Sequence, residues 1–204
     1  MGINERKTRQ QEELRNRIIE QSWTIIQQEG WQALSIRRIA DAIEYSVPVI
    51  YKHFANKEAI QEHFIKEGFR KLTEQLRQAE RNETNNERRI QQIAYAYWKF
   101  AAQHTEHYRI MFGLGMPACE TVNSVAEMKE MSETMRLAIA NTATEHSNEH
   151  IDLFLKMKTF WSMLHGFISI ELLSNNKIQN EPSPVFTDAI DSFMFTLIFK
   201  KKQL

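Results

Sequence analysis

A run of hydrogen-bond donors near residue 50 has the composition of a phosphate-binding segment. Tyr51, Lys52 and His53 are consecutive, and Lys57 follows four residues later. Asn56 is suited to cap a helix that begins at Lys57, and the free N–H groups at the start of a helix favour a phosphate. Hydroxyl, ammonium and imidazole groups all donate to the phosphate oxygens of nucleic acid. The run therefore predicts contacts to a phosphate backbone.

Aromatic residues with polar tips form a second candidate site, in the later part of the chain. Indole, phenol and imidazole rings combine apolar surface with a few hydrogen-bonding atoms, which suits a cavity for a small molecule. The candidate lining residues are Tyr95, Trp98, His104, Tyr108, Phe112, Met116, Trp161 and His165. Because this set has no cluster of Lys or Arg, we expect a largely apolar or aromatic ligand. An ordinary aromatic core is the alternative interpretation for each single residue.

Metal-binding and catalytic patterns are weak. His104 with His107, and His146 with His150, have spacings that could place two metal ligands on one helix face, but each pair lacks an obvious third ligand. Cys119 has no neighbouring His or basic cluster that would activate its thiol. The sequence contains neither a phosphate-binding glycine motif nor a nucleophile elbow. We therefore expect a protein that is not an enzyme and that uses no metal or cofactor.

The composition bounds the class of protein. The 204 residues include 26 Lys and Arg and 26 Asp and Glu, so the formal net charge is zero, which excludes a polyelectrolyte. The lone Cys119 excludes an intramolecular disulfide and suits a reducing compartment. The apolar stretches are interrupted well before the roughly 18 residues of a membrane span, and the charged N-terminus lacks the apolar run of a signal peptide. We expect a soluble, cytoplasmic protein.

Helical periodicity runs through nearly the whole chain, and capping residues and helix breakers divide it. Only 6 Gly and 4 Pro are present, too few for an all-β protein, and no strand pattern or internal repeat is evident. The sequence therefore predicts an all-α, nine-helix chain with two domains. The expected helices cover residues 10–29, 36–43, 46–53, 56–80, 87–103, 106–112, 120–145, 149–174 and 185–201.

Two of these helices are very short and are joined by a tight turn. Ser35 and Ser46 are suited to cap them. The pattern predicts a helix-turn-helix over about residues 35–54, whose second helix enters the DNA major groove. The surrounding residues resemble the N-terminal signature of TetR-type transcriptional regulators. The matching residues are Arg17, Ile18, Ile19, Gly30, Leu34, Ser35, Ile36, Ile39, Ala40, Ser46, Tyr51, His53, Phe54, Lys57 and Glu58.

The resemblance implies an all-helical homodimer that binds operator DNA with its N-terminal domain and a small molecule with its C-terminal domain. It implies a helix-turn-helix three-helix bundle at residues 1–57 and a larger ligand-binding and dimerisation domain at 58–204, with the helix over 56–80 bridging the two. The expected DNA-binding residues are Ser35, Arg37, Tyr45, Ser46, Val47, Pro48, Val49, Tyr51, Lys52, His53 and Lys57.

Two departures from the family pattern lie in the helix-turn-helix. Glu44 stands where the family has Gly, and a left-handed conformation there would cost about 1–2 kcal/mol, so a turn of different shape is one expectation. Pro48 and Val49 replace a Gly-Thr pair and make the reading surface apolar. With Val47, they suit contacts to thymine methyl groups, and Arg37 is the candidate for a guanine or a phosphate.

The last two predicted helices carry more apolar residues than one chain's core can bury, which favours an intermolecular contact. The resemblance likewise implies a dimer interface on these helices. The expected interface residues are Phe167, Ile170, Phe186, Ile190, Phe193, Met194 and Leu197. The segment around Trp161, His165 and Gly166 also resembles the Trp…His-Gly signature of one subfamily of TetR-type C-terminal domains.

The sequence therefore predicts a ligand-responsive transcriptional regulator. We expect a homodimeric repressor that a small apolar or aromatic molecule releases from palindromic operator DNA. One alternative is a DNA-binding protein of the same fold without an effector, such as a nucleoid or division factor. The other is a helical carrier or enzyme that borrows the N-terminal fold.

Overall fold

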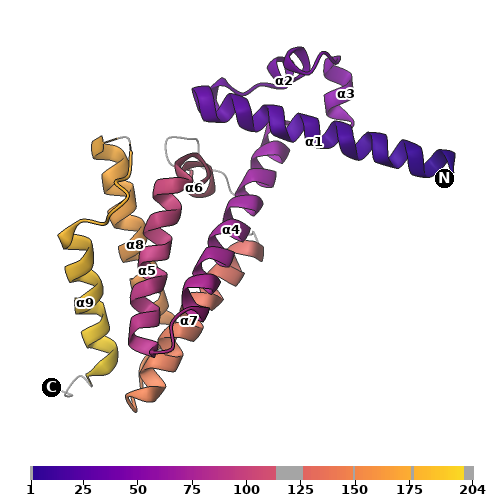
Figure 1. Ribbon diagram of the computed structural model, residues 1–204. Coiled ribbons are helices and arrows are strands. Elements are labelled where there is room, and N and C mark those ends of the chain that lie inside the picture. The colour runs from indigo at the N-terminus through magenta and orange to yellow at the C-terminus, as the bar shows by residue number, and fades with distance from the viewer. Residues whose placement is uncertain (1, 114–125, 149, 176, 200–204) are drawn as a thin grey trace.

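The computed structural model describes residues 2–113, 126–148, 150–175 and 177–199, and these ranges are helical nearly throughout, with no strand (Figure 1). The all-α prediction is confirmed, and each expected helix has a counterpart. The elements are α1 (Ile3–Glu29), the 3-10 helix η1 (Trp31–Ala33), α2 (Ile36–Ala42), α3 (Val47–Tyr51), α4 (Lys57–Arg81), α5 (Asn86–Gln103), α6 (Thr105–Phe112), α7 (Ala126–Glu145), α8 (Leu153–Asn175) and α9 (Pro184–Ile198).

Helix α1 begins at Ile3, seven residues before the start that the sequence predicts. The Glu5 carboxylate accepts a hydrogen bond from the Gly2 N–H at 2.9 Å and so caps the first turn. Arg9 and Glu13 add an ion pair one turn apart. Because this part of α1 is polar and exposed, apolar periodicity could not reveal it. Figure 1 shows it projecting beyond α3.

The turn between α2 and α3 keeps a left-handed residue even though that residue is glutamate. Glu44 has a φ of 60°. Its N–H donates to Asp41 O at 3.3 Å, and the Tyr45 N–H donates to Ala40 O at 2.9 Å. These two bonds form a Schellman motif, the usual helix end that favours Gly at this position. The expectation of a differently shaped turn is therefore wrong.

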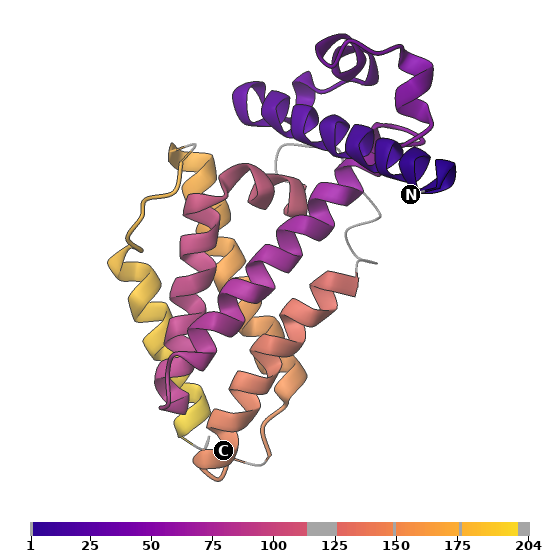
Figure 2. The ribbon, with the colours of Figure 1, turned by 45° about the vertical axis from the view of Figure 1, so that its right-hand side comes forward.

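Helix α4 connects the N-terminal helices to a bundle of α5, α7, α8 and α9, with α6 lying across its upper part (Figures 1 and 2). The Asn56 side chain caps α4 by accepting from the Ala59 N–H at 2.8 Å. Phe64, Phe69 and Leu72 on α4 are buried. A side chain on Gly68 would overlap Met111, so this glycine lets α6 lie directly against α4.

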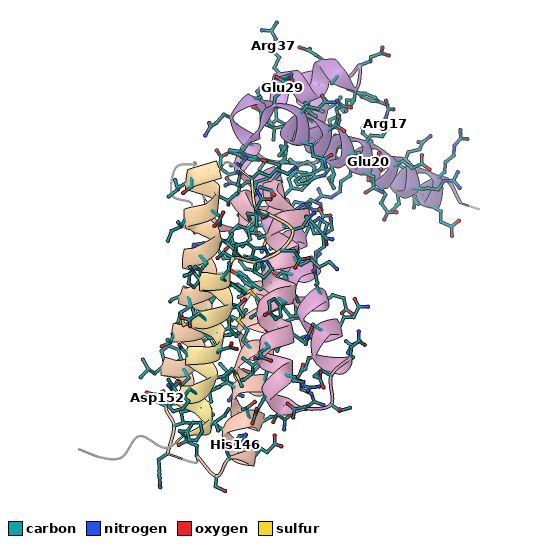
Figure 3. All side chains as sticks on the ribbon, turned by 60° about the vertical axis from the view of Figure 1, so that its left-hand side comes forward. Arg17, Glu20, Glu29, Arg37, His146 and Asp152 are labelled. Carbon is teal, nitrogen blue, oxygen red and sulfur yellow. The ribbon has the colours of Figure 1, made fainter. Side chains whose placement is uncertain are left out.

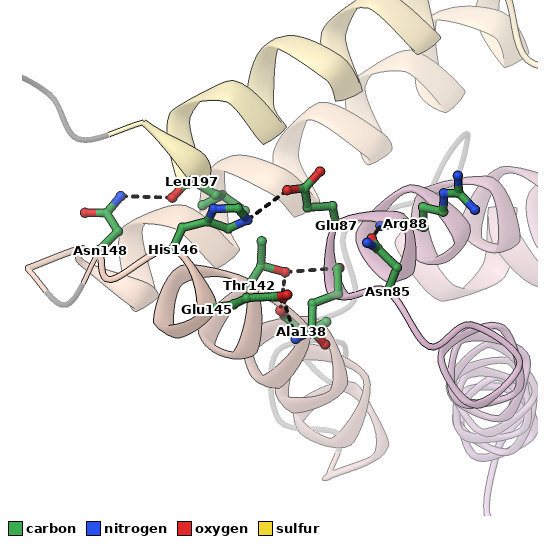
Figure 4. Close-up of polar contacts among 10 residues, drawn as sticks. Asn85, Glu87, Arg88, Ala138, Thr142, Glu145, His146, Asn148 and Leu197 are labelled. Carbon is green, nitrogen blue, oxygen red and sulfur yellow. Dashed lines mark hydrogen bonds and ion pairs between the residues drawn. The ribbon is translucent and has the colours of Figure 1, made fainter.

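The far end of the bundle is closed by polar contacts among α5, α7 and α9 (Figure 4). Thr142 donates to Asn86 O at 3.1 Å, and the Asn86 amide donates to Glu145 at 2.8 Å. The Asn148 side chain donates to Leu197 O at 3.0 Å. Leu197 O lies in the last turn of α9, where a carbonyl has no intrahelical partner, and the three bonds together hold α5 and α9 to α7 and the residues that follow it.

Several helix ends differ from the predicted ones. Helix α8 begins at Leu153 instead of residue 149, because the Asp152 carboxylate accepts from the Leu155 N–H at 2.9 Å and caps it there. Helix α9 ends at Ile198, before the predicted residue 201. The predicted start of α7 at residue 120 lies outside the described residues.

The strained turn makes a direct prediction for stability. Replacing Glu44 by Gly should raise the free energy of unfolding by about 0.5–1 kcal/mol, because glycine removes the left-handed penalty but leaves a more flexible unfolded chain. Urea denaturation would measure the change. Ala42→Gly, at the end of α2, is the matched control and should lower the free energy of unfolding. A destabilised Glu44→Gly protein would contradict the strain.

Candidate functional site

Helix α3, which the sequence predicts to be the recognition helix, presents several of its predicted contact residues to solvent. Tyr51 and Tyr45 are 52% and 41% exposed, and Lys52 and Pro48 are also exposed. Ile50 is fully buried and anchors the helix to the N-terminal core. The structure therefore leaves one side of α3 available for a macromolecule.

Residues next to α3 extend this exposed surface. Val47 and Val49 are half-buried, whereas the Ser46 side chain is exposed and makes no capping bond. Ser35 caps α2 by accepting from the Arg38 N–H at 3.2 Å. Arg37 points outward from α2, at the end of the molecule opposite His146 (Figure 3).

Other basic residues near α3 are engaged inside the protein. The Lys57 ammonium donates to Trp31 O at 3.1 Å and lies 4.6 Å from the centroid of the Trp31 ring. Burial lowers the pKa of Lys57. The Arg15 guanidinium donates to His53 O at 2.9 Å, and burial, more than Arg15, lowers the pKa of the His53 imidazole. Lys57 therefore holds α4 to η1 in this structure, rather than pointing to solvent.

Four of the predicted pocket residues come together in the C-terminal bundle: Tyr108 and Phe112 on α6, and Trp161 and His165 on α8. The Phe112 ring centroid lies 4.6 Å from that of Tyr108 and 4.6 Å from that of His165. Tyr97 on α5, which the sequence did not single out, lies at the centre of their hydrogen bonds. Its hydroxyl accepts from the Trp161 indole N–H at 3.1 Å and lies 3.3 Å from the Tyr108 hydroxyl.

One assignment of protons gives every one of these groups a partner. An indole N–H can only donate, so Tyr97 accepts from Trp161. In this assignment Tyr97 donates to Tyr108, Tyr108 donates to His165 Nδ1 at 2.6 Å, and the neutral His165 ring has its proton on Nε2, 3.4 Å from the Ser169 hydroxyl. Burial lowers the pKa of His165 and raises the pKa values of both tyrosines, so the network is uncharged.

The remaining predicted pocket residues lie elsewhere. Tyr95 and Trp98 contact Phe186 on α9, with ring centroids 6.2 and 5.0 Å apart, and the Trp98 indole donates to Gln179 O at 2.8 Å. His104 lies where α5 meets α6, against Phe100. Met116 lies outside the described residues. Tyr95 and Tyr97 are two residues apart on a helix and face different sides, so only one of them reaches the network.

The predicted dimer residues on α9 are buried within the chain itself, so that assignment is wrong for most of them. Phe186, Ile190, Phe193, Met194 and Leu197 are at most 5% exposed. They pack on residues of their own chain, as in the contact between the Phe193 and Phe160 rings at 5.0 Å.

Of the predicted dimer residues on α8, Phe167 is half-buried and Ile170 is exposed. Apart from Ile170, the apolar side chains exposed on and next to α8 and α9 differ from the predicted ones. The exposed apolar residues are Phe154, Leu155, Ile170, Leu173, Val185, Phe195 and Phe199.

The candidate metal pairs have other contacts. The His107 ring lies against Trp23 in a tilted arrangement, and His146 Nε2 lies 2.8 Å from a Glu87 oxygen. Within the described ranges, no three His, Cys, Asp or Glu residues are placed to hold a metal ion. Cys119 lies outside those ranges. No helix in the described part of the chain has the length and apolar character to span a bilayer.

A helix-turn-helix carried on a larger helical bundle is the architecture of a bacterial regulatory protein. The family model described as "Bacterial regulatory proteins, tetR family" matches residues 18–64. A second, described as "Tetracyclin repressor-like, C-terminal domain", matches residues 90–193, which is half of the chain. The chain belongs to the TetR family of transcriptional regulators.

Relatives and solved structures agree with this assignment. The chain is 28% identical over 112 residues to the HTH-type transcriptional activator FasR of Mycolicibacterium smegmatis. That match covers 54% of this chain and 51% of FasR, about half of its length. The fatty acid degradation regulator FadR of Bacillus halodurans has a similar fold, with a TM-score of 0.68, 15% identity and coverage of 93% of this chain and 97% of FadR.

FadR of Bacillus subtilis in complex with stearoyl-CoA also has a similar fold. Its TM-score is 0.67 at 15% identity, and the match covers 89% of this chain and 96% of FadR. At this identity the likeness shows the fold alone.

Proposed function

We propose that the protein is a dimeric DNA-binding regulator that leaves its operator when a small, largely apolar molecule binds. The observation that carries the proposal is the exposed face of α3, held on a Schellman turn with Tyr51 and Lys52 directed to solvent. Residues 1–57 act as the DNA-binding domain and residues 58–204 as the effector and dimerisation domain. Such a protein resides in the cytoplasm, where its operator lies.

Contacts to DNA divide into phosphate and base contacts. Tyr51 and Lys52 donate to phosphates, assisted by Ser35, Tyr45, Ser46 and His53 at the edges of the surface. Pro48, with Val47 and Val49, contacts thymine methyl groups, and Arg37 reaches a guanine or a neighbouring phosphate. Lys57 contributes to the positive end of α4, where a backbone phosphate would lie.

The uncharged network of Tyr97, Tyr108, Trp161 and His165 supports an apolar ligand. It offers hydroxyl, indole and imidazole groups but no formal charge, so it suits a neutral polar group on an apolar body. The solved FadR of Bacillus subtilis holds stearoyl-CoA. We propose a ligand with a long apolar chain near this network, whose charged groups, where it has any, remain outside the buried part.

The outer face of α8 and α9 supports a dimer. Gly166 lies in the middle of α8, and a Cβ added there would meet nothing within 4 Å among the described residues. Glycine inside a helix lowers the stability by about 1 kcal/mol relative to alanine. We infer that a contact with another molecule, rather than a contact within this chain, explains the glycine at this position. A second copy that packs α8 against α8 would use the space at Gly166, flanked by the exposed Leu155, Ile170 and Leu173.

The DNA surface is tested by selecting duplexes from a random pool and titrating salt. Lys52→Ala should weaken binding to every duplex and flatten the slope of log affinity against log salt by about 0.9, because one phosphate contact is lost. Lys99→Ala, on the exposed side of α5, is the control and should leave the slope unchanged. Enrichment of no duplex by the wild-type protein would contradict DNA binding itself.

The ligand site is tested by tryptophan fluorescence with stearoyl-CoA as the probe. Binding should change the emission of the wild-type protein and release the selected duplex. Trp161→Phe should abolish most of the fluorescence change, because this indole belongs to the network. Trp98→Phe, whose indole bonds to Gln179, should retain it. The reverse pattern would move the ligand away from the network.

The dimer face is tested by analytical ultracentrifugation. Gly166→Leu should convert the dimer to a folded monomer, since a Cβ at this position meets no described atom of its own chain and the leucine would occupy the space proposed for the partner's α8. The control is Lys129→Leu, an exposed substitution on α7 that should leave the protein dimeric. A Gly166→Leu protein that remains dimeric at micromolar concentration would place the interface elsewhere.

A further inference from the structure

The ammonium group of Lys158, in the first half of α8, lies against two aromatic rings. Lys158 Nζ is 5.3 Å from the centroid of the Trp161 ring and 5.7 Å from that of the Phe154 ring, and both distances are within the range of a cation–π interaction. Lys158 itself is exposed. The two rings therefore orient a positive charge that solvent can reach.

This charge is not neutralised within the described part of the chain. Lys71 Nζ lies 2.6 Å from a Glu67 oxygen, and Lys156, two residues before Lys158 on α8, donates to the Thr196 hydroxyl at 2.5 Å. No carboxylate of the described residues lies within ion-pair distance of Lys158. A cation without an anionic partner is available to an anion from outside the chain.

Trp161 connects the surface at Lys158 with the interior of the bundle. Its indole N–H donates to the hydroxyl of Tyr97, which is fully buried, at 3.1 Å. Trp161 itself is half-buried, and its ring lies beside Phe112 at the end of α6, with centroids 6.3 Å apart. One side chain therefore contacts the uncharged network with its N–H group and the Lys158 ammonium with its ring.

Phe154, Lys158, Trp161 and His165 form one stripe along α8, because residues three and four apart lie on the same side of a helix. The stripe begins with the Phe154 ring, which is 66% exposed, and ends in the hydrogen bond from Tyr108 to His165. It lies about a third of a turn around α8 from Gly166, so it is separate from the proposed dimer face. The stripe therefore runs from an exposed apolar ring, past a cation, to the neutral polar groups of the network.

We propose that Lys158 binds the anionic head group of the effector, so that the effector is an amphiphile with a carboxylate or phosphate at one end. The inference rests on the proposed function, since it assigns the outer end of the ligand proposed there. The apolar chain runs past Trp161 to the network, where only neutral groups meet it. The charged end stays at the exposed Lys158, where an anion loses little of its hydration. An ammonium pairs equally with carboxylate and phosphate oxygens, because it acts as a point charge.

The test compares three ligands with the same apolar chain, namely laurate, lauroyl-CoA and dodecanol, by isothermal titration calorimetry. Lys158→Gln should weaken binding of an anionic ligand about fivefold at low salt, the size of an exposed ion pair, and should leave dodecanol within about twofold of wild type. Lys158→Arg should retain the wild-type affinities. A loss for laurate identifies a carboxylate as the partner of Lys158, and a loss confined to lauroyl-CoA identifies a phosphate. Added salt should weaken anion binding by the wild type more than by Lys158→Gln.

The matched control is Lys156→Gln, which makes the same change of charge two residues away on α8 and should leave all three affinities unchanged. An equal loss for dodecanol in Lys158→Gln would show that Lys158 only supports the Trp161 ring, and would overturn the inference. Unchanged binding of both anions in Lys158→Gln, or the same loss in Lys156→Gln, would also overturn it. A wild-type protein that binds dodecanol but neither anion overturns the inference and leaves the proposed apolar ligand in place. A wild-type protein that binds none of the three contradicts both.

Discussion

The burial of one face of α4 is the interaction on which both domains depend. Near its start, Phe64 packs on Trp23 of α1, and further along Phe69 packs on Phe112 of α6, with ring centroids 5.0 and 5.5 Å apart. The same helix is capped by Asn56 beside the recognition helix. Because a packed helix moves as a rigid unit, a displacement in the bundle would be transmitted along α4 to the proposed DNA-binding surface.

The two proposed sites use polar groups in opposite ways. On the DNA side, Tyr51 and Lys52 are exposed, whereas Arg15 and Lys57 support the helices from inside. On the ligand side, Trp161 and Tyr97 belong to a partly buried chain of hydrogen bonds that continues through Tyr108 to His165. A network whose polar groups are already hydrogen-bonded to one another disfavours the entry of water and of charged groups, whereas an exposed donor can bind a phosphate oxygen. The buried part of the proposed ligand site therefore disfavours charged groups, whereas the proposed DNA-binding surface favours charged phosphates.

Periodicity and capping residues predicted the helices well, because Ser35, Asn56 and similar caps act through local geometry. The N-terminal part of α1 was not predicted, because a polar, exposed helix has no apolar periodicity in its sequence. Tyr97 was not predicted as a site residue because its role depends on tertiary packing. The helical period shows that Tyr95 and Tyr97 face different sides of α5, but it does not show which side contacts α8. The dimer residues on α9 were misassigned because burial by one's own chain and burial by a second copy require the same apolar side chains.

Three residues lower the stability of the isolated chain, and each lies at a different proposed interface. Glu44 is left-handed where glycine would be relaxed, His107 is buried with no hydrogen bond to its ring nitrogens among the described residues, and Gly166 lies inside α8 where a Cβ would meet no described atom within 4 Å. Such local conflicts are expected where a sequence serves function rather than folding alone. Glu44 lies beside the DNA surface, His107 at the junction of the domains, and Gly166 on the face offered to a second copy. A chain optimised only for stability would carry none of the three.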